Sequence, residues 1–352
     1  MPKSHSPRMK KHLLLLATLS LFLQHCKSTE EAPNPVETAS PRVPETADNY
    51  LTTLPAHIQT ALAGTDNTPT NNLLTNDGAA LGRVLFYDKN LSLNRTVSCG
   101  SCHKQAASFD DEVALSKGFN NALTTRNSMS LLNVRFYRSG KMFWDERAAT
   151  LEKQALQPIQ NPLEMGLTLA ELENRVKSLS YYPALFQKAF GSTTVDSIKI
   201  AKALAQFERS LVTYRSKYDR VKQGLETFTA AEARGEQVFL ATPGGGGAIS
   251  CGGCHTPPMF ITSAPAGPFA FPLEAGINGQ NRFKSGSLRN VGTRKFLFHQ
   301  GTIPDVNSLF NGQRPVPAHN IPAPDVANMI AFLNTLTDES ITQDPKFSDP
   351  FN

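Results

Sequence analysis

Two short runs of the chain have the pattern C-x-x-C-H, at residues 99–103 (C-G-S-C-H) and 251–255 (C-G-G-C-H). The pattern is typical of c-type haem attachment, in which the two cysteines form thioether bonds to the porphyrin and the histidine binds the iron. The two runs use four of the five cysteines of the chain. We therefore expect two covalently bound haem c groups, one on Cys99, Cys102 and His103 and one on Cys251, Cys254 and His255.

Two other kinds of site contain C-x-x-C. A zinc site would bring the two cysteine pairs together and needs no histidine directly behind each pair. A redox dithiol of the thioredoxin type would follow a strand and precede a helix. The second run instead follows four glycines at 244–247 and precedes Pro257-Pro258, so haem attachment is favoured over both alternatives.

The N-terminus has the composition of an export signal. Arg8, Lys10 and Lys11 precede an apolar run at 13–23, which predicts a signal peptide over residues 1–25. The apolar run is too short to favour a membrane-spanning helix. Cys26 would then be the lipidated first residue of a bacterial lipoprotein; the alternative is simple secretion, with Cys26 removed or left as a free thiol.

Export agrees with the haem motifs, because bacteria attach c-type haem outside the cytoplasm. We therefore expect a periplasmic protein whose link to the membrane is the lipid on Cys26. The formal net charge is +5, but several of the positive charges lie in the signal peptide, so the remainder is nearly neutral. With no basic stripe, the sequence predicts no nucleic-acid partner.

Helical signals dominate the rest of the chain. Residues 26–48 are rich in Pro, Thr, Glu and Ala and predict a disordered linker. Capping boxes at 168–171 and 229–232 predict helix starts, apolar spacing predicts a helix over about 196–216, and Pro324-Asp325 opens a last helix. We expect a mainly α fold with long loops.

An internal repeat indicates how this fold is organised. The first haem motif is followed by S-L-L-N-V at 130–134 and by K-M-F-W-D-E at 141–146. The second is followed by S-L-R-N-V at 287–291 and by K-F-L-F-H-Q at 295–300. The repeat predicts two cytochrome c-like domains, each around one haem, at residues 49–225 and 226–345.

Several phrases resemble those of the bacterial dihaem cytochrome c peroxidases and MauG-like enzymes. Residues 143–156 (F-W-D-E-R-A-A-T-L-E-K-Q-A-L) are close to the family phrase F-W-D-G-R-A-x-T-L-E-x-Q-A, and 161–165 (N-P-L-E-M) to N-P-x-E-M. Phe283-Lys284, the phrase at 287–291 and His299 also match. The resemblance covers roughly residues 70 to 340.

The resemblance implies roles for individual residues. His103 would bind the iron of the haem that reacts with peroxide, and His255 that of the electron-transfer haem. Glu164 and Gln154 would lie over the reacting haem, where a carboxylate can move a proton between the peroxide oxygens and an amide can orient the peroxide. Trp144, the only tryptophan, would carry electrons between the haems. The plain alternatives are exposed residues for Glu164 and Gln154 and a core aromatic for Trp144.

The chain departs from the family at three places. Classical members close the resting peroxidatic haem with a histidine from a loop after the first motif, yet no histidine lies between His103 and His255. We therefore predict a five-coordinate or water-bound reacting haem in the oxidised protein. The family also holds a calcium ion, for which Asn127 matches one ligand. Arg294-Lys295-Phe296 replaces the Thr-x-Pro stretch that supplies others, which counts against calcium here.

The third departure is the sixth ligand of the second haem. Relatives use a Met or a Tyr downstream of the position of His299, but the matching positions here are Gln313 or Phe310. His319 is our first candidate and His299 our second, with Met259 and Met329 as alternatives. Arg126-Asn127 and Arg289-Asn290 fit either haem propionates or contacts between domains.

The resemblance favours a peroxidase that reduces hydrogen peroxide to water with electrons from a small cytochrome or cupredoxin. The alternative is a MauG-like oxidase that uses high-valent haem iron to oxidise Trp or Tyr residues of a partner protein. A plain electron carrier would lack the distal carboxylate and the tryptophan phrase. The sequence does not indicate the oligomeric state.

Overall fold

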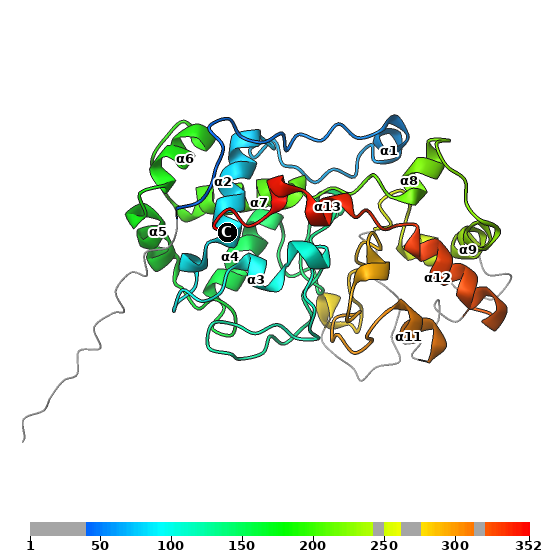
Figure 1. Ribbon diagram of the computed structural model, residues 1–352. Helices are drawn as coiled ribbons and strands as arrows, with labels where there is room; N and C mark the ends of the chain where they lie inside the picture. The colour runs from blue at the N-terminus through cyan, green and yellow to red at the C-terminus, as the bar shows by residue number, and fades with distance from the viewer. Residues whose placement is uncertain (1–39, 242–249, 262–275, 313–320) are drawn as a thin grey trace, which may run out of the picture. The chain divides into compact units, whose positions relative to one another are not determined.

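The computed structural model describes residues 40–241, 250–261, 276–312 and 321–352, and in these residues the protein is mainly helical, as predicted (Figure 1). Within the described residues no strand forms, and pairing is limited to isolated β-bridges. The α-helices are α1 Ala56–Ala61, α2 Asn76–Tyr87, α3 Cys99–Cys102, α4 Leu151–Gln160, α5 Leu169–Ser178, α6 Tyr182–Phe190, α7 Ser197–Ser210, α8 Lys217–Lys222, α9 Ala230–Leu240, α10 Cys251–Cys254, α11 Val306–Asn311, α12 Val326–Asn334 and α13 Ser340–Gln343. The 3₁₀ turns are η1 Lys89–Leu91, η2 Gln105–Ala107, η3 Val134–Phe136, η4 Ile277–Gly279, η5 Val291–Thr293, η7 Ala323–Asp325 and η8 Pro345–Phe347.

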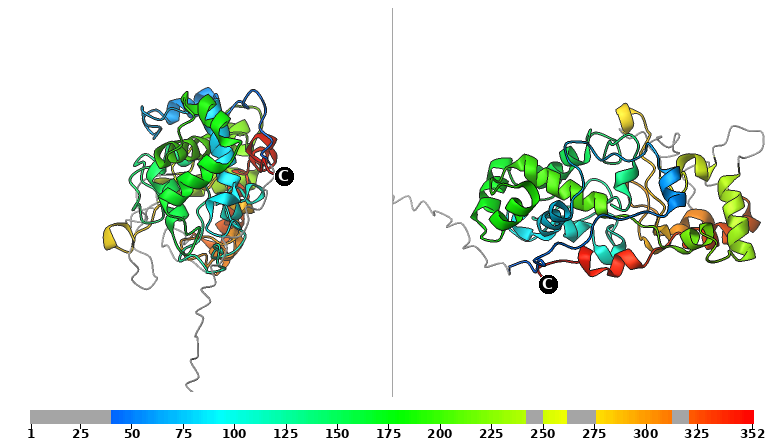
Figure 2. Two further views of the ribbon diagram at one scale, coloured as in Figure 1. Left: turned by 90° about the vertical axis from the view of Figure 1, so that its left-hand side faces the viewer. Right: turned by 90° about the horizontal axis from the view of Figure 1, so that it is seen from above.

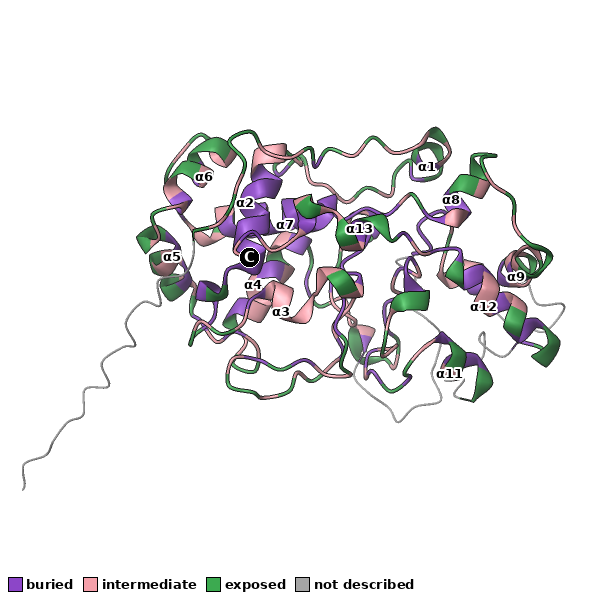
Figure 3. Cartoon of the chain, in the orientation of Figure 1, coloured by how far each residue is buried: buried purple, intermediate pink, exposed green. Residues whose placement is uncertain are grey.

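A first hydrophobic core surrounds the packed pair α2 and α7, both largely buried (Figure 3). The Thr75 side chain caps α2 by accepting from the Gly78 N–H, and Asp196 caps α7. A side chain at Gly82 would collide with the Ala203 carbonyl of α7. Glycine therefore lets the two helices cross at very short range.

A second core surrounds α9 and α12 and repeats this arrangement. The predicted capping box at Thr229 is present: the Thr229 hydroxyl accepts from the Glu232 N–H, and the Glu232 carboxylate accepts from the Thr229 N–H. Gly235 of α9 faces the Asn328 carbonyl of α12 so closely that a Cβ would not fit. Each core thus contains a helix pair with a glycine at its crossing, in agreement with the internal repeat.

Two helix limits differ from the prediction. The helix expected over 196–216 ends at Ser210, because the chain turns extended there and a second capping box, Ser216 with Asp219, opens α8. Pro324-Asp325 lies in the 3₁₀ turn η7, and α12 begins at Val326. This helix is also not the last, since α13 follows it.

The C-terminal segment returns to the first core (Figure 2). The Tyr87 hydroxyl donates to the Phe347 carbonyl at 2.7 Å, and Arg83 Nε donates to the Ser348 carbonyl at 2.6 Å. Packing around the first core therefore includes residues beyond the predicted domain limit at 225. The limits 49–225 and 226–345 stay a prediction.

The signal peptide at 1–25, Cys26 and residues 26–39 of the predicted linker lie outside the described residues. Residues 40–48 are described, and they contact the first core. Arg42 N–H donates to the Pro350 carbonyl at 2.7 Å, and Lys188 Nζ donates to the Glu45 carbonyl at 2.6 Å. The packed part of the chain thus begins before residue 49. Among the described helices, none has the length and apolar character needed to cross a membrane.

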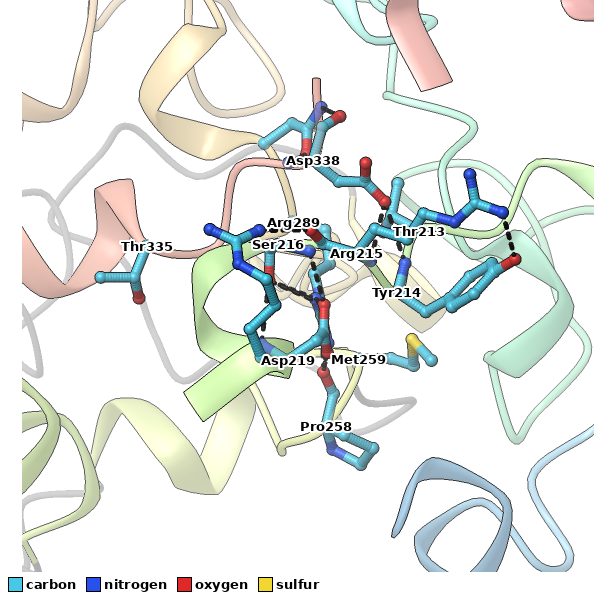
Figure 4. Close-up of polar contacts among 12 residues, drawn as sticks. Thr213, Tyr214, Arg215, Ser216, Asp219, Pro258, Met259, Arg289, Thr335 and Asp338 are labelled. Atoms are coloured by element: carbon cyan, nitrogen blue, oxygen red, sulfur yellow. Dashed lines mark hydrogen bonds and ion pairs between the residues drawn. The ribbon is translucent and has the colours of Figure 1, made fainter. Parts of the chain in front are cut away.

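A buried ion pair connects the segment that joins the two cores with the second half of the chain (Figure 4). Both guanidinium ends of Arg289 donate to the Asp219 carboxylate, at 2.5 and 2.8 Å, and neither side chain is exposed. The Asp338 carboxylate accepts from the N–H groups of Tyr214 and Arg215. The sequence suggested either a haem propionate or a contact between domains for Arg289, and the structure shows a contact between parts of the chain.

Candidate functional site

The two C-x-x-C-H runs have the same local structure. Each C-x-x-C forms one short helical turn, α3 or α10, that begins after a serine cap and ends at the histidine. None of the four cysteines forms a disulfide. In both turns the sulfurs are therefore not bonded to each other.

His103 is held in one orientation by a backbone contact. Its Nδ1 lies 3.1 Å from the Phe109 carbonyl oxygen, so Nδ1 carries the proton and donates, and Nε2 keeps its lone pair. Burial lowers the pKa of His103 below its ordinary value. A neutral imidazole with its second nitrogen tied to a carbonyl is the usual state of an iron ligand.

His255 repeats this arrangement in the second half. Its Nδ1 lies 3.0 Å from the Gly286 carbonyl, and burial lowers its pKa to about 4. Both histidines thus carry an Nε2 lone pair at neutral pH.

A cavity of about 1120 Å³ adjoins His103, and Gln154, Glu164 and Trp144 line it as well. Gln154 comes from α4, and Glu164 from the turn that follows α4. The structure therefore brings together at one cavity the residues that the sequence assigned to peroxide chemistry.

Glu164 is partly buried, and burial raises its pKa above the ordinary carboxyl value, against the effects of Asn161 and Arg147. Asn161 Nδ2 donates to Glu164 Oε1 at 2.6 Å. The Glu164 backbone is also fixed, because the Phe119 N–H donates to the Glu164 carbonyl at 2.9 Å. A carboxyl group in this setting can gain and lose a proton closer to neutral pH than an exposed one.

The loop after the first motif packs directly on this carboxylate segment. At Gly118 a Cβ would overlap the Leu163 carbonyl, so only glycine allows this approach. Residues 116–121 contain no histidine. The loop thus supports Glu164 but offers no imidazole to the cavity.

A second cavity, of about 1210 Å³, adjoins His255, Cys251 and Cys254. Among the candidates for a sixth ligand, His299 and Met329 line this cavity, and both are almost fully buried. Met129, which we did not consider, lines it too. Met259 lies in the first core instead, and His319 and Gln313 lie outside the described residues.

Trp144 lies in the wall of both cavities. Its indole N–H donates to the Asn127 carbonyl at 2.8 Å, and its own carbonyl accepts from the Lys284 N–H at 2.8 Å. The indole is therefore fixed between the cavity that contains His103 and the one that contains His255.

The backbone also corrects the alignment of the internal repeat by one residue. Aligned from their first residues, the phrases at 141–146 and 295–300 set Trp144 against Phe298. In the structure the equivalent β-bridges are Met142–Ala148 and Leu297–Ile303, and Phe143 and Phe298 share a left-handed backbone. Trp144 is therefore equivalent to His299, and the two rings lie 6.3 Å apart.

Lys284 is a site residue whose importance the sequence did not reveal, although it belongs to the matched Phe283-Lys284 phrase. It lines both cavities, and burial lowers its pKa to about 7. Its ammonium group contacts the Lys141 carbonyl and lies 3.5 Å from the centre of the Tyr137 ring.

Asn127 forms hydrogen bonds to backbone carbonyls through both its side chain and its main chain. Its side-chain N–H donates to the Ala114 carbonyl at 2.9 Å, and its main-chain N–H donates to the His299 carbonyl at 2.9 Å. Within the described residues no group of three or more His, Cys, Asp or Glu side chains is arranged to hold a metal ion. A calcium ion would find no acidic cluster among these residues.

The residues present fit a haem at each motif. Each site combines two cysteines that form no disulfide, a neutral histidine whose Nε2 keeps its lone pair, and a cavity beside that histidine. In the second cavity two buried polar side-chain atoms, Arg294 Nε and Ser285 Oγ, have no hydrogen-bond partner within the described part of the chain. Buried polar groups rarely stay unpaired, so this cavity is shaped for a group with polar atoms of its own.

Comparison with known proteins agrees with this site. The family model described as di-haem cytochrome c peroxidase matches residues 76–227. The cytochrome c551 peroxidase of Nitrosomonas europaea is 32% identical over 276 residues, which cover 74% of this chain and 80% of that protein. The methylamine utilization protein MauG of Paracoccus denitrificans is 35% identical, covering 74% of this chain and 88% of that protein.

Among solved structures, a MauG-like protein associated with microbial copper homeostasis matches with a TM-score of 0.71 and 28% identity, covering 82% of this chain and 97% of that chain. Fold and sequence similarity therefore extend over most of both proteins. The chain belongs to the family of dihaem cytochrome c peroxidases and MauG proteins, a family of oxidoreductases.

Proposed function

We propose that this protein is a dihaem c-type peroxidase that reduces hydrogen peroxide to two water molecules, using two protons and two electrons from a small cytochrome or cupredoxin. The observation that supports this most is the cavity shared by His103, Gln154 and Glu164, which has Trp144 in its wall in common with the cavity of His255. One haem c at each motif would supply the redox chemistry.

In this proposal Glu164 moves the proton. Its raised pKa would let the carboxylate take a proton from one peroxide oxygen and pass it to the other, which would leave as water. The Asn161 hydrogen bond holds the carboxylate in place during both transfers. The Gln154 amide orients the peroxide by hydrogen bonding.

Trp144 carries electrons from the second site to the first. It is fixed at both its indole N–H and its carbonyl, so its ring keeps one position relative to the two cavities. Electrons from the donor would enter at the site of His255, whose cavity has Trp144 in its wall, as the first cavity does.

A MauG-like oxidase is the second candidate, and the loop at 116–121 is the observation that favours it. This loop packs on Glu164 and has no histidine to close the first site. Such an enzyme would retain two oxidising equivalents and remove electrons from a Trp or Tyr side chain of a partner protein. The identity to the Paracoccus MauG supports the same candidate.

We also propose a periplasmic location, with export directed by residues 1–25 and a lipid anchor on Cys26. The basic and apolar segments of the N-terminus support this, and c-type haem attachment outside the cytoplasm agrees with it.

A steady-state assay with hydrogen peroxide and a reduced small cytochrome tests the proposal. Rapid turnover that falls strongly in Trp144→Leu, with both haems shown by mass spectrometry, is the expected result. Negligible turnover together with a long-lived oxidised state would instead identify the MauG-like activity. A protein that reacts with peroxide at the same rate after Glu164→Gln would contradict both assignments.

A further inference from the structure

Two polar side-chain atoms in the second cavity are buried without a hydrogen-bond partner among the residues that the structure describes. They are Arg294 Nε and Ser285 Oγ, and both residues line the cavity that adjoins His255. Leaving such groups unpaired costs about 1–3 kcal/mol each, and more for a charged one. Two unpaired donors at one cavity indicate a bound group with acceptor atoms.

The remaining contacts of Arg294 leave its charge only partly balanced. Its side chain is 11% exposed, and one terminal nitrogen donates to the Ser287 carbonyl at 2.6 Å. The other lies 3.9 Å from Asp110 Oδ2, which is too far for a hydrogen bond. A buried guanidinium that has no hydrogen bond to its carboxylate partner attracts an additional anion.

We propose that Arg294 and Ser285 bind a propionate carboxylate of the haem held by Cys251, Cys254 and His255. The inference rests on the proposed haem at this site. The thioether bonds and the histidine would fix the porphyrin, whose propionates are its anionic groups. A planar guanidinium recognises a carboxylate through two parallel hydrogen bonds, and the serine hydroxyl donates a further one.

The other cation that lines this cavity is already engaged. Among the described residues, Lys284 is the one other Lys or Arg in the lining, and it contacts the Lys141 carbonyl and lies against the Tyr137 ring. Arg289, which the sequence offered for a propionate, is fully buried in its ion pair with Asp219. The propionate role therefore falls to Arg294.

The position of Arg294 adds a connection between the halves of the chain. Asp110, its ion-pair partner at 3.9 Å, follows the first haem motif and also lines the second cavity. A propionate on Arg294 would lie near this buried carboxyl group. The guanidinium charge also favours the reduced, less positive haem, so its removal should lower the reduction potential of this haem alone.

Arg294→Gln in the haem-loaded protein tests the proposal, with Lys295→Gln as the matched control. The control removes the same charge one residue away, from a side chain that is 61% exposed. We expect Arg294→Gln to lower the equilibrium constant for reduction of the second haem at least tenfold, which is 59 mV for a one-electron couple. Arg294→Lys should restore part of this shift, and Lys295→Gln should change little.

Resonance Raman spectroscopy of the propionate bending band supplies a second measurement that is independent of activity. Ser285→Ala removes one hydroxyl and no charge, and we expect it to shift this band. An unchanged band in Ser285→Ala, or equal shifts of the potential in Arg294→Gln and Lys295→Gln, would overturn the inference. If the parent protein carries no haem at Cys251 and Cys254 by mass spectrometry, the proposed function itself fails.

Discussion

Replacement of Glu164 by glutamine removes a proton-transfer group at the first cavity and leaves the local structure in place. The hydrogen bond that holds this side chain runs from Asn161 Nδ2 to Glu164 Oε1 at 2.6 Å. A glutamine keeps an acceptor oxygen at that position and nearly the same volume. The variant therefore loses the ability to carry a proton while keeping its anchor.

The expected magnitude follows from these two effects. A neutral acceptor in place of a charged one weakens the Asn161 hydrogen bond by about 1 kcal/mol, which is small for a folded domain. General acid–base catalysis contributes about 10²–10⁴-fold to a rate, or roughly 2.7–5.4 kcal/mol on the barrier. We expect Glu164→Gln to lower the second-order rate constant for hydrogen peroxide by this factor with little loss of folding stability.

Stopped-flow mixing of the protein with peroxide measures this constant without any electron donor. In the parent the rate should fall with decreasing pH as Glu164 becomes protonated, at a pKa above the ordinary carboxyl value, whereas the variant should lack this transition. Glu112→Gln is the control, since that side chain is 51% exposed and contacts Lys104 and Lys295. A rate for Glu164→Gln within tenfold of the parent, or an unchanged pH profile, would refute the role of this carboxylate.

Three further substitutions test the scaffold. Gly118→Ala should displace the Leu163 carbonyl and destabilise the fold by about 1–3 kcal/mol, with a parallel loss of peroxide reactivity; full reactivity would show that the loop does not position the site. Arg289→Met leaves the Asp219 carboxylate buried without its cation and should cost about 3–5 kcal/mol in denaturant unfolding, and a loss below 1 kcal/mol would contradict this. Burial raises the pKa of Glu208 to about 8 in the folded protein, from about 4.5 when the chain is unfolded. Between these two values the folded state binds a proton that the unfolded state does not, so the free energy of unfolding falls as the pH rises from about 4.5 to 8. Glu208→Gln should therefore stabilise the fold at pH 8, by on the order of 4 kcal/mol, and change the melting temperature little near pH 4.

Local signals in the sequence predicted helix starts well. The capping boxes at Thr168 and Thr229 are both present, because each needs only residues three positions apart. The end of α7 at Ser210 was missed, although Ser216 and Asp219 form the same kind of box. The apolar spacing continues past Ser210, so the sequence pattern did not indicate that a second helix begins after Ser216.

Residues of the site were predicted where a motif names them, and missed where the fold alone brings them together. The two C-x-x-C-H motifs indicated both histidines, and the phrases around them indicated the groups beside the first cavity. No local pattern shows that Arg294 and Ser285 leave polar atoms unpaired at the same cavity, since this depends on which partners the rest of the fold takes. Arg289 illustrates the same limit, because its partner Asp219 lies 70 positions away in the sequence.

The position of Trp144 follows from the internal repeat and from two reciprocal hydrogen bonds between its halves. Asn127 and Lys284 both lie six positions before the equivalent asparagines, Asn133 and Asn290. The Asn127 N–H donates to the His299 carbonyl, and the Lys284 N–H donates to the Trp144 carbonyl, so each half of the repeat supplies a donor to the other.

This exchange places the two equivalent residues beside each other, at 6.3 Å between ring centres. The wall between the two cavities contains equivalent segments from both halves of the repeat. Each segment can therefore place a different residue type at the same position of the wall. Here Trp144 lines both cavities, whereas His299 lines the second and stacks on Phe283 at 3.7 Å. Because the backbone pairing fixes both residues, a substitution of Trp144 should change electron transfer between the sites without moving either histidine that follows a C-x-x-C turn.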